Sequence, residues 1–242
     1  MRWAVIALFL VAGAAAAPAS QQQAPDLRPV DGVYSSPSLV DPYHIAIRDA
    51  LLAEHEYRKC QMVVLPSFRA EWVVYVVQDD NQRPGRLVYK AMRKMLWGEM
   101  QRQIEKDAPD PRSYSVGPEA EVAALRKVTK EVDVRVVDLD ASSIAVLERA
   151  WSDMLARTRY PAPTGLVGMD GTSYVAANWS RVTGPQSGET WSPEKGTPTY
   201  DLVAIAEKLR DLALAPQERQ TRLKVEVVAM ANALQARLKG LK

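Results

Sequence analysis

The sequence predicts an α+β fold: a small, antiparallel-rich sheet packed by several amphipathic helices, with the C-terminal helix docked on the domain. Short Val-rich runs, typical of strands, cluster before residue 93 and recur near residues 133 and 170. Between and after these runs, apolar residues recur at spacings of three and four, which is the helical period. Strands and helices do not alternate regularly, and no fixed-period repeat is present, so the pattern favours α+β over α/β.

The first strands are expected to form a meander that follows one helix. Asp41 and Pro42 supply an N-cap and a first-turn proline, and this helix is predicted to reach about Glu56. The runs "QMVVLPS" and "EWVVYVVQ" then indicate two strands with little exposed face. After the polar turn at 79–85, "RLVYKAM" returns as a third strand, so we expect antiparallel pairing.

Two helices, a strand and a third helix are expected in the middle of the chain. We favour a helix from Met95 to Lys106 and predict another from Glu119 to Lys130, separated by a loop with three prolines. "VDVRVVDLD" is predicted as a strand whose alternate valines share one side. From Ile144 to Leu155 the apolar residues recur at three and four, which predicts an amphipathic helix.

The last third of the chain combines turn signals with two long helices. Asp170-Gly171 lies between two strand-like segments and is typical of a two-residue hairpin turn. The Gly-, Ser- and Pro-containing stretch Ser180–Thr190 is predicted as a loop, and Thr197-Pro198 as the start of a helix. A final helix is predicted over 216–239. Its apolar stripe lasts under three heptads, which favours docking on its own domain over pairing with a partner helix.

The N-terminus has the three-part layout of a secretory signal peptide. A positive start at Arg2 is followed by an apolar run of ten residues, Trp3–Ala12, and then by small residues. The run is too short to cross a bilayer, which favours cleavage over a retained membrane anchor. We expect cleavage after Ala19, with Ala16 as the alternative. The segment 1–19 therefore predicts an exported protein, periplasmic or extracellular.

Two further segments follow the signal peptide. Residues 20–40 are poor in apolar residues and rich in Gln, Pro and Ser, which predicts a flexible N-terminal linker. Residues 41–242 are expected to form a single α+β domain, with no membrane span after signal cleavage. Cleavage would remove Arg2 and no acidic residue, which changes the net charge from +2 to +1. This balance argues against nucleic acid and anionic membranes as partners.

Cysteine and histidine are scarce. Cys60 is the only cysteine, so no intramolecular disulfide can form. Its place at the start of "CQMVVLP" favours a small buried hydrophobe over a reactive or intermolecular thiol. His44 and His55 are both predicted on the first helix, about 16 Å apart along its axis, too far to bind one metal together. We expect no metal and no cofactor.

The most site-like motif is Asp138-Leu139-Asp140, at the end of an apolar strand. It resembles the nucleophile motif of haloacid-dehalogenase-like phosphatases, and this resemblance implies a hydrolase with Asp138 and Asp140 in the two acidic positions. That family also needs a later lysine and a second acidic cluster, and no acidic pair ends an apolar strand in the rest of the chain. A helix N-cap formed by Asp140 or Ser142 explains the same residues, and we favour it.

The serines and glycines give weaker signals. Gly-x-Ser-x-Gly is absent, and turn chemistry explains Ser67 after Pro66. Gly165, Gly168 and Gly171 are spaced by three residues, which matches neither a phosphate loop nor a dinucleotide motif. These glycines favour a hairpin with close backbone approach.

Aromatic side chains near the predicted loop at Ser180–Thr190 supply the binding surface that we expect. This surface consists of Tyr174, Trp179, Trp191 and Tyr200. Tryptophans beside loops anchor protein partners or the faces of sugars. The alternative is that they pin the loop onto its own core.

These observations predict an exported, non-catalytic binding or accessory protein, of an inhibitor or immunity type or an envelope factor. Its expected partner is a protein or an envelope component. No paired catalytic carboxylates, metal-spaced ligands or nucleophile motif are found, which leans against an enzyme. The alternative is an exported hydrolase whose site is assembled from residues scattered in sequence. Its first candidates are Asp138, Asp140, Ser67 and Glu71.

Overall fold

The computed structural model describes residues 26–30, 41–53, 57–108, 117–159, 170–181 and 183–241. These residues form a six-stranded sheet in the order β4-β3-β2-β1-β5-β6, in which all neighbouring strands are antiparallel. Six helices accompany the sheet in this part of the chain. The predicted α+β class is therefore confirmed.

The first three strands form the predicted meander, and β4, which follows α2 and α3, extends it by pairing with β3. α4 then carries the chain to β5, which pairs with the other side of β1. The strands are β1 (Arg58–Pro66), β2 (Trp72–Val77), β3 (Gly85–Met92), β4 (Val132–Leu139), β5 (Thr172–Ser180) and β6 (Gly184–Trp191). The helices are α1 (Pro42–Leu51), α2 (Leu96–Asp107), α3 (Pro118–Lys127), α4 (Ala141–Leu155), α5 (Pro198–Leu214) and α6 (Gln217–Gly240).

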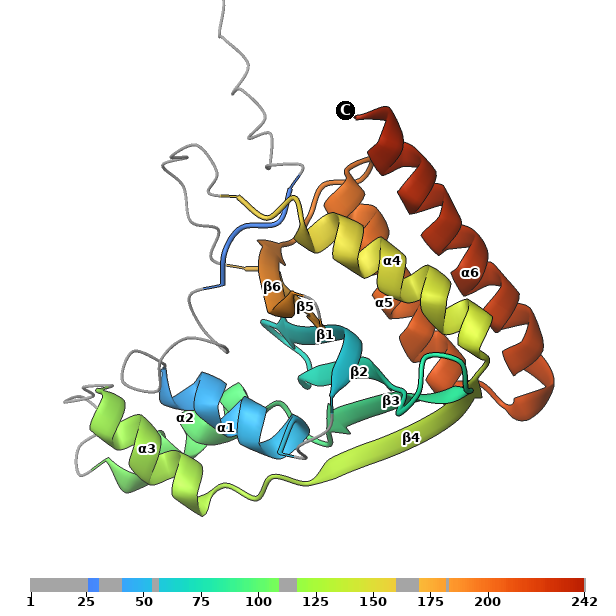
Figure 1. The fold of residues 1–242 in the computed structure, drawn as a ribbon. Helices are drawn as coiled ribbons and strands as arrows, with labels where there is room; N and C mark the ends of the chain where they lie inside the picture. Colours follow the sequence, from blue (N-terminus) through green and yellow to red (C-terminus); the bar gives the residue numbers. More distant parts are fainter. Residues whose placement is uncertain are drawn as a thin grey trace, which may run out of the picture.

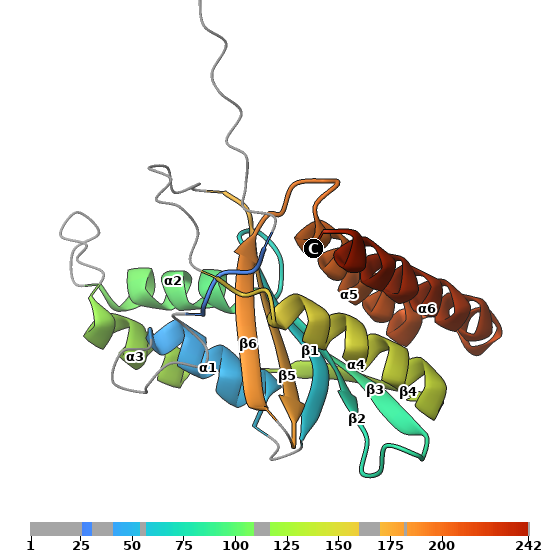
Figure 2. The same cartoon turned by 45° about the horizontal axis from the view of Figure 1, so that its top comes forward.

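Helices cover both faces of the sheet (Figure 1). α4, α5 and α6 lie on one face and α1, α2 and α3 on the other, as Figure 2 shows after a turn of the molecule. Because successive strand residues point to opposite faces, Val74 and Val76 enter the core under α4–α6, while Val73 and Tyr75 enter the core under α1–α3. Burial on both faces explains why β2 is a continuous apolar run in the sequence.

The observed helix starts agree with the predicted N-caps, whereas α1 and α3 end earlier than predicted. The Asp41 side chain accepts a hydrogen bond from the Tyr43 N–H at 2.8 Å, as expected of an N-cap. α1 ends at Leu51, short of the predicted Glu56, which lies outside the described residues. α3 ends before the predicted Lys130, because the ammonium group of Lys130 turns back and donates to the carbonyl of Leu125 at 2.6 Å.

The segment predicted as a loop, Ser180–Thr190, is mostly strand β6, so that prediction was wrong. β6 is an edge strand that pairs with β5 along its whole length. Gly184, at the start of β6, has a positive φ of +70°, as turn glycines do, whereas Gly188 is required by packing. A Cβ on Gly188 would lie 2.7 Å from Thr158 Oγ1 and 2.9 Å from Leu27 Cβ, so only glycine fits there. An edge strand also tolerates Pro185.

Part of the predicted linker 20–40 lies against the fold. Leu27 is buried in the core under α4–α6, and the Arg28 N–H donates to the Glu189 carbonyl of β6 at 2.9 Å. The carboxylate of Asp26 is buried and pairs with Arg157 and Arg159. Residues 26–30 are thus docked on the β6 side of the sheet, while the rest of 20–40 and the predicted signal peptide 1–19 lie outside the described residues.

The Asp170-Gly171 pair directly precedes β5 and does not form the predicted type of turn. A type I′ turn needs positive φ at both positions, and the described glycines with positive φ are Gly184 and Gly196. Gly171 instead lacks a side chain because the ring of Trp191 occupies that space. Gly165 and Gly168 lie outside the described residues.

The C-terminal helix is docked on the domain, as predicted, and its bounds match the expected 216–239 to within one residue. One stripe of α6, including Leu223, Val227, Ala231 and Leu234, is buried in the core shared with α4 and α5. The Gln235 side chain adds a hydrogen bond to the Val146 carbonyl of α4 at 2.9 Å. None of the helices in the described ranges combines the length and apolar character that crossing a membrane requires.

Candidate functional site

Glu71, a candidate for the hydrolase alternative, is a completely buried cap for α2. Its carboxylate accepts hydrogen bonds from the backbone N–H groups of Leu96 at 2.9 Å and Trp97 at 3.2 Å, and from the Tyr43 hydroxyl at 2.7 Å. The positive end of the α2 dipole stabilises this buried charge. Burial, and then the neighbouring Glu71 carboxylate, raises the pKa of Tyr43. Glu71 therefore holds α1, α2 and β2 together.

Asp140 is the N-cap of α4, which confirms the favoured interpretation of its motif. Its carboxylate accepts from the Ser143 N–H at 2.8 Å and the Ser143 hydroxyl at 2.7 Å, and also from the Ser142 hydroxyl. These bonds lower the pKa of Asp140 from 3.8 to about 2. Asp138 is exposed on the face of β4 opposite to Val137 and Leu139. Among the described residues, no three His, Cys, Asp or Glu side chains are grouped so that they could hold a metal ion.

Asp140→Ala is expected to lower the free energy of unfolding at pH 7 by about 1 kcal/mol, the usual value of a lost N-cap. The folded-state pKa lies below the ordinary value, so this contribution is present above pH 4 and is lost as the pH falls from 4 towards 2. Urea unfolding of both proteins at pH 7 and near pH 2 measures it. Asp138→Ala is the control, expected to change stability by less than about 0.5 kcal/mol. Equal losses in the two variants would contradict the assignment.

The side chains of Ser67 and His44 also contact other parts of the fold. The Ser67 hydroxyl donates to the Gly171 carbonyl at 2.7 Å and accepts from the Gly171 N–H at 3.1 Å, which ties the end of β1 to the start of β5. His44 is half-buried on α1. Burial lowers the pKa of its imidazole, and the nearby Asp41 carboxylate, which acts in the opposite direction, offsets only part of this shift. His55 lies outside the described residues.

A bulge in β1 supplies the most unusual local geometry in the described chain. Cys60 and Gln61 together oppose one residue of β2, because the register shifts between Lys59 and Met62. Cys60 has a φ of +49°, which a residue with a side chain adopts only where its surroundings enforce it. Its N–H donates to the Asn178 side chain of β5 at 3.1 Å, and that amide in turn donates to Ser152 of α4 at 3.0 Å. α4 and β5 thus clamp the bulge.

The bulge directs Lys59 into a buried polar cluster. Its ammonium group lies 2.6 Å from Asn81 Oδ1, 3.0 Å from Glu148 Oε2 and 3.3 Å from Gln78 Oε1. Only 6% of the Lys59 side chain is exposed, against 26% for Glu148. An ammonium group has three N–H donors, and each has an acceptor here. Lys59 is therefore a structural charge that joins β1 to the β2–β3 turn and to α4.

Cys60, next to this cluster, is a buried thiol. Its side chain is completely buried, and burial raises its pKa, with Glu148 acting in the same direction and Lys59 against it. A nucleophilic cysteine requires a lowered pKa and access to solvent. The predicted interpretation of Cys60 as a small buried hydrophobe matches these surroundings.

An open hollow of about 970 Å³ lies over the Lys59 cluster, at the end of the sheet where β1 and β3 begin and β2 and β5 end. A second hollow of about 350 Å³ shares Gln78, Asn81 and Glu148 with it and extends along α4. The lining of the larger hollow includes the guanidinium groups of Arg86 and Arg181, the acids Asp79 and Asp80, and the amide of Gln82. We call the larger space the sheet-end hollow.

An aromatic pair forms one wall of the sheet-end hollow. The rings of Tyr57 and Trp179 lie 4.4 Å apart between centroids, at 36° to one another. Two-thirds of the Tyr57 side chain is exposed (67%), so this ring is open to a ligand or solvent. The pair presents a flat apolar surface beside polar groups of both signs.

The four aromatic residues predicted to form one surface are divided between the two ends of β5 and β6. Trp179 lies opposite Pro185 at the sheet-end hollow, whereas Trp191 lies opposite Ser173, six residues away along β5 or roughly 20 Å. Tyr174 is partly buried against the core under α4–α6, and Tyr200 lies in the first turn of α5. Only Trp179 of the four lines the sheet-end hollow.

Most residues of the sheet-end hollow had no signal in the sequence. Lys59, Gln78 and Asn81 come from two strand ends and a turn, and Glu148 from a helix far along the chain. One signal was available: Lys59 directly precedes a run of buried strand residues, where a lysine needs a partner. In comparisons with known proteins, no family model, no curated protein and no solved structure matches this chain.

Proposed function

We propose that this protein is an exported, non-catalytic binding protein that holds a saccharide of the cell envelope in the sheet-end hollow. The observation that carries the proposal is the Tyr57–Trp179 pair, with Tyr57 exposed and Trp179 partly buried, on the wall of a hollow of about 970 Å³. A volume near this size suits a small-molecule ligand. Trp179 belongs to the surface expected from the sequence, and Tyr57 extends it.

The polar lining favours a sugar over a singly charged ligand. Sugar hydroxyls both donate and accept hydrogen bonds, and the wall offers both roles: Arg86 and Arg181 donate, while Asp79 accepts. Neither arginine forms an ion pair with a described residue, so both guanidinium groups are available to a ligand. A flat sugar face can lie on the aromatic pair, since Trp and Tyr combine an apolar ring with a polar edge.

Three of the four side chains considered for the hydrolase alternative have structural roles, and the fourth, Asp138, is exposed on β4 away from the sheet-end hollow. Glu71, Asp140 and Ser67 have their polar atoms occupied by bonds that shape helix starts and strand ends. Lys59 and Glu148, the charged pair nearest the sheet-end hollow, neutralise each other.

Titration with soluble saccharides released from envelope material tests the proposal, with the indole N–H signals of the tryptophans as the readout. We expect the Trp179 signal to shift and the Trp191 signal to stay in place. Trp179→Ala is expected to weaken binding about tenfold or more, the effect of losing a central aromatic anchor. Trp191→Ala, the matched control from the other end of the hairpin, is expected to change it less than twofold. No saccharide-dependent shift of Trp179 would overturn the proposal.

A further inference from the structure

In the part of the chain that the structure describes, β4 is an edge strand of the sheet. It pairs with β3 along its whole length, and no other strand of the described chain lies beside it. Val134 and Val136 are 45% and 51% exposed, and both lie on the face that also holds Val132. Open edges with exposed apolar side chains are sites of strand addition.

The direction of the peptide groups along β4 follows from one bond. The Arg93 N–H donates to the Glu131 carbonyl at 2.9 Å, so this residue pair is hydrogen-bonded across β3 and β4. In an antiparallel ladder the hydrogen-bonded pairs alternate. The peptide groups of Asp133 and Arg135 therefore point towards β3, and those of Val132, Val134 and Val136 point outward. The outward direction agrees with a bond from the Arg135 guanidinium to the Val134 carbonyl.

We propose that β4 pairs antiparallel with β4 of a second copy of this chain, with Val134 opposite Val134 at the twofold axis. In this register Val132 lies opposite Val136 of the other copy, so the exposed apolar row is continued across the interface. Asp133 lies opposite Arg135 on both sides of the axis. These charged residues form non-hydrogen-bonded pairs, whose side chains lie closest in an antiparallel ladder.

Charge selects this register among the neighbouring ones. A shift that places Val134 opposite Val136 brings Arg135 against Arg135, and the reverse shift brings Asp133 against Asp133. Like charges directly opposite each other destabilise a strand pair. Odd shifts set outward peptide groups against inward ones, so the ladder could not form. The register centred on Val134 is the one that satisfies hydrogen bonds, apolar side chains and charges together.

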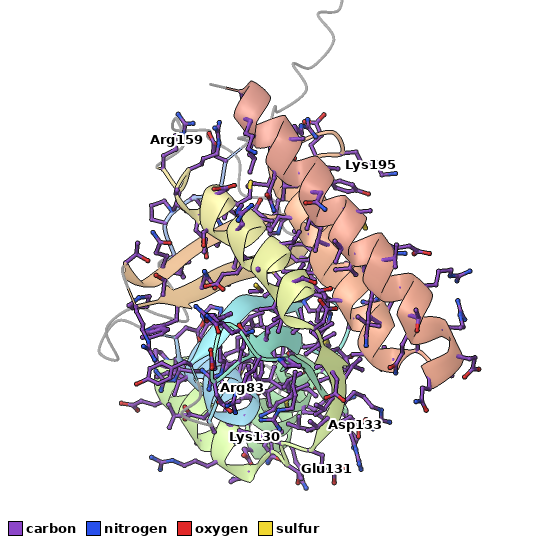
Figure 3. All side chains as sticks on the ribbon, turned by 45° about the vertical axis from the view of Figure 1, so that its right-hand side comes forward. Arg83, Lys130, Glu131, Asp133, Arg159 and Lys195 are labelled. Carbon is purple, nitrogen blue, oxygen red and sulfur yellow. The ribbon has the colours of Figure 1, made fainter. Side chains whose placement is uncertain are left out.

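The charged side chains are already placed near the edge. Asp133 lies 2.8 Å from the Arg93 guanidinium, and its carboxylate would lie between Arg93 and Arg135 of the second copy. Figure 3 shows Glu131 and Asp133 projecting outward where β4 begins. On pairing, Arg135 would exchange the Val134 carbonyl for the partner's Asp133, while the partner's backbone N–H takes that carbonyl.

A two-strand seam is a small interface, below the roughly 1,000 Å² of stable complexes. We therefore expect a dimer that depends on concentration. Sedimentation velocity of the full chain from about 1 µM to about 1 mM measures it. Val134→Pro removes an outward N–H but no bond to β3, and is expected to abolish the dimer. Val134→Ala, which keeps that N–H, is the matched control and should retain it.

Charge exchange tests the register separately. Asp133→Arg and Arg135→Asp each place like charges opposite one another twice, and each is expected to weaken the dimer about tenfold. The double variant, with the two charges exchanged, should recover to within about threefold. A mixture of the two single variants should form a heterodimer. The double variant also loses the ion pair between Arg93 and Asp133. If its dimer nevertheless recovers, the effect of the single variants comes from the interface and not from lost stability within one copy.

Two results would overturn the proposal. One is a chain that stays monomeric over the whole concentration range. The other is a dimer that neither Val134→Pro nor the charge variants change, because a different surface would then form it. Thermal unfolding of each variant, measured alongside, identifies any variant whose fold is lost. If Asp133→Arg is such a variant, Arg135→Asp still tests the register, because it keeps the ion pair between Arg93 and Asp133.

Discussion

Glu71→Ala is expected to lower the free energy of unfolding by about 4 kcal/mol, because it leaves buried hydrogen-bond donors without an acceptor. The carboxylate is completely buried and accepts from two amides of α2 and from Tyr43. Hydrogen bonds to a charged group contribute about 1.5 to 3 kcal/mol each, and their losses are not fully additive. Urea unfolding at pH 7 measures the change.

Tyr43→Phe is the matched control for that experiment. It removes one of the three hydrogen bonds and leaves the carboxylate bound to α2, so we expect a loss of only about 1 kcal/mol. A loss below about 1 kcal/mol for Glu71→Ala would show that water replaces the carboxylate at the start of α2.

Glu148→Ala is expected to destabilise the protein by about 3 kcal/mol, because Lys59 would keep a buried charge without its counter-ion. The Lys59 side chain is 6% exposed, whereas Glu148 is 26% exposed and keeps contact with water. The asymmetry predicts that Lys59→Met, which removes the more buried charge, costs only about 1 kcal/mol.

The double variant Lys59→Met/Glu148→Ala completes the cycle for this pair. We expect it to be about as stable as Lys59→Met alone, since the carboxylate has little function once the ammonium group is gone. Additive losses in the double variant would mean that the two side chains stabilise the fold independently. Urea unfolding of all four proteins supplies the coupling free energy.

Local sequence patterns predicted the elements whose formation depends on nearby residues. Asp41 and Asp140 each cap the helix that directly follows, and the short Val-rich apolar runs of the meander predicted its strands. The end of α3 was misjudged because a side chain, Lys130, takes the place of the last helical turn. β6 was missed because Gly188 is chosen for contact with Leu27 and Thr158, residues that the sequence does not bring near it.

The sheet-end hollow was the least predictable part of the molecule. Lys59 meets Glu148, 89 residues away, only because the β1 bulge and α4 come together in the folded chain. The Tyr57–Trp179 pair likewise joins the start of β1 to the end of β5. Trp179 was singled out because it flanks the segment predicted as a loop, but its separation from Trp191 required the register of β5 and β6.

The place of β1 between β2 and β5 has a consequence for how the chain reaches its native state. β1 acquires its first neighbour from the adjacent hairpin, but the bond between Cys60 and Asn178 joins residues 118 positions apart. Contacts of such separation slow folding. Until the C-terminal third has been synthesised, the apolar edge of β1 stays open to other chains, so a truncated product would be prone to aggregate.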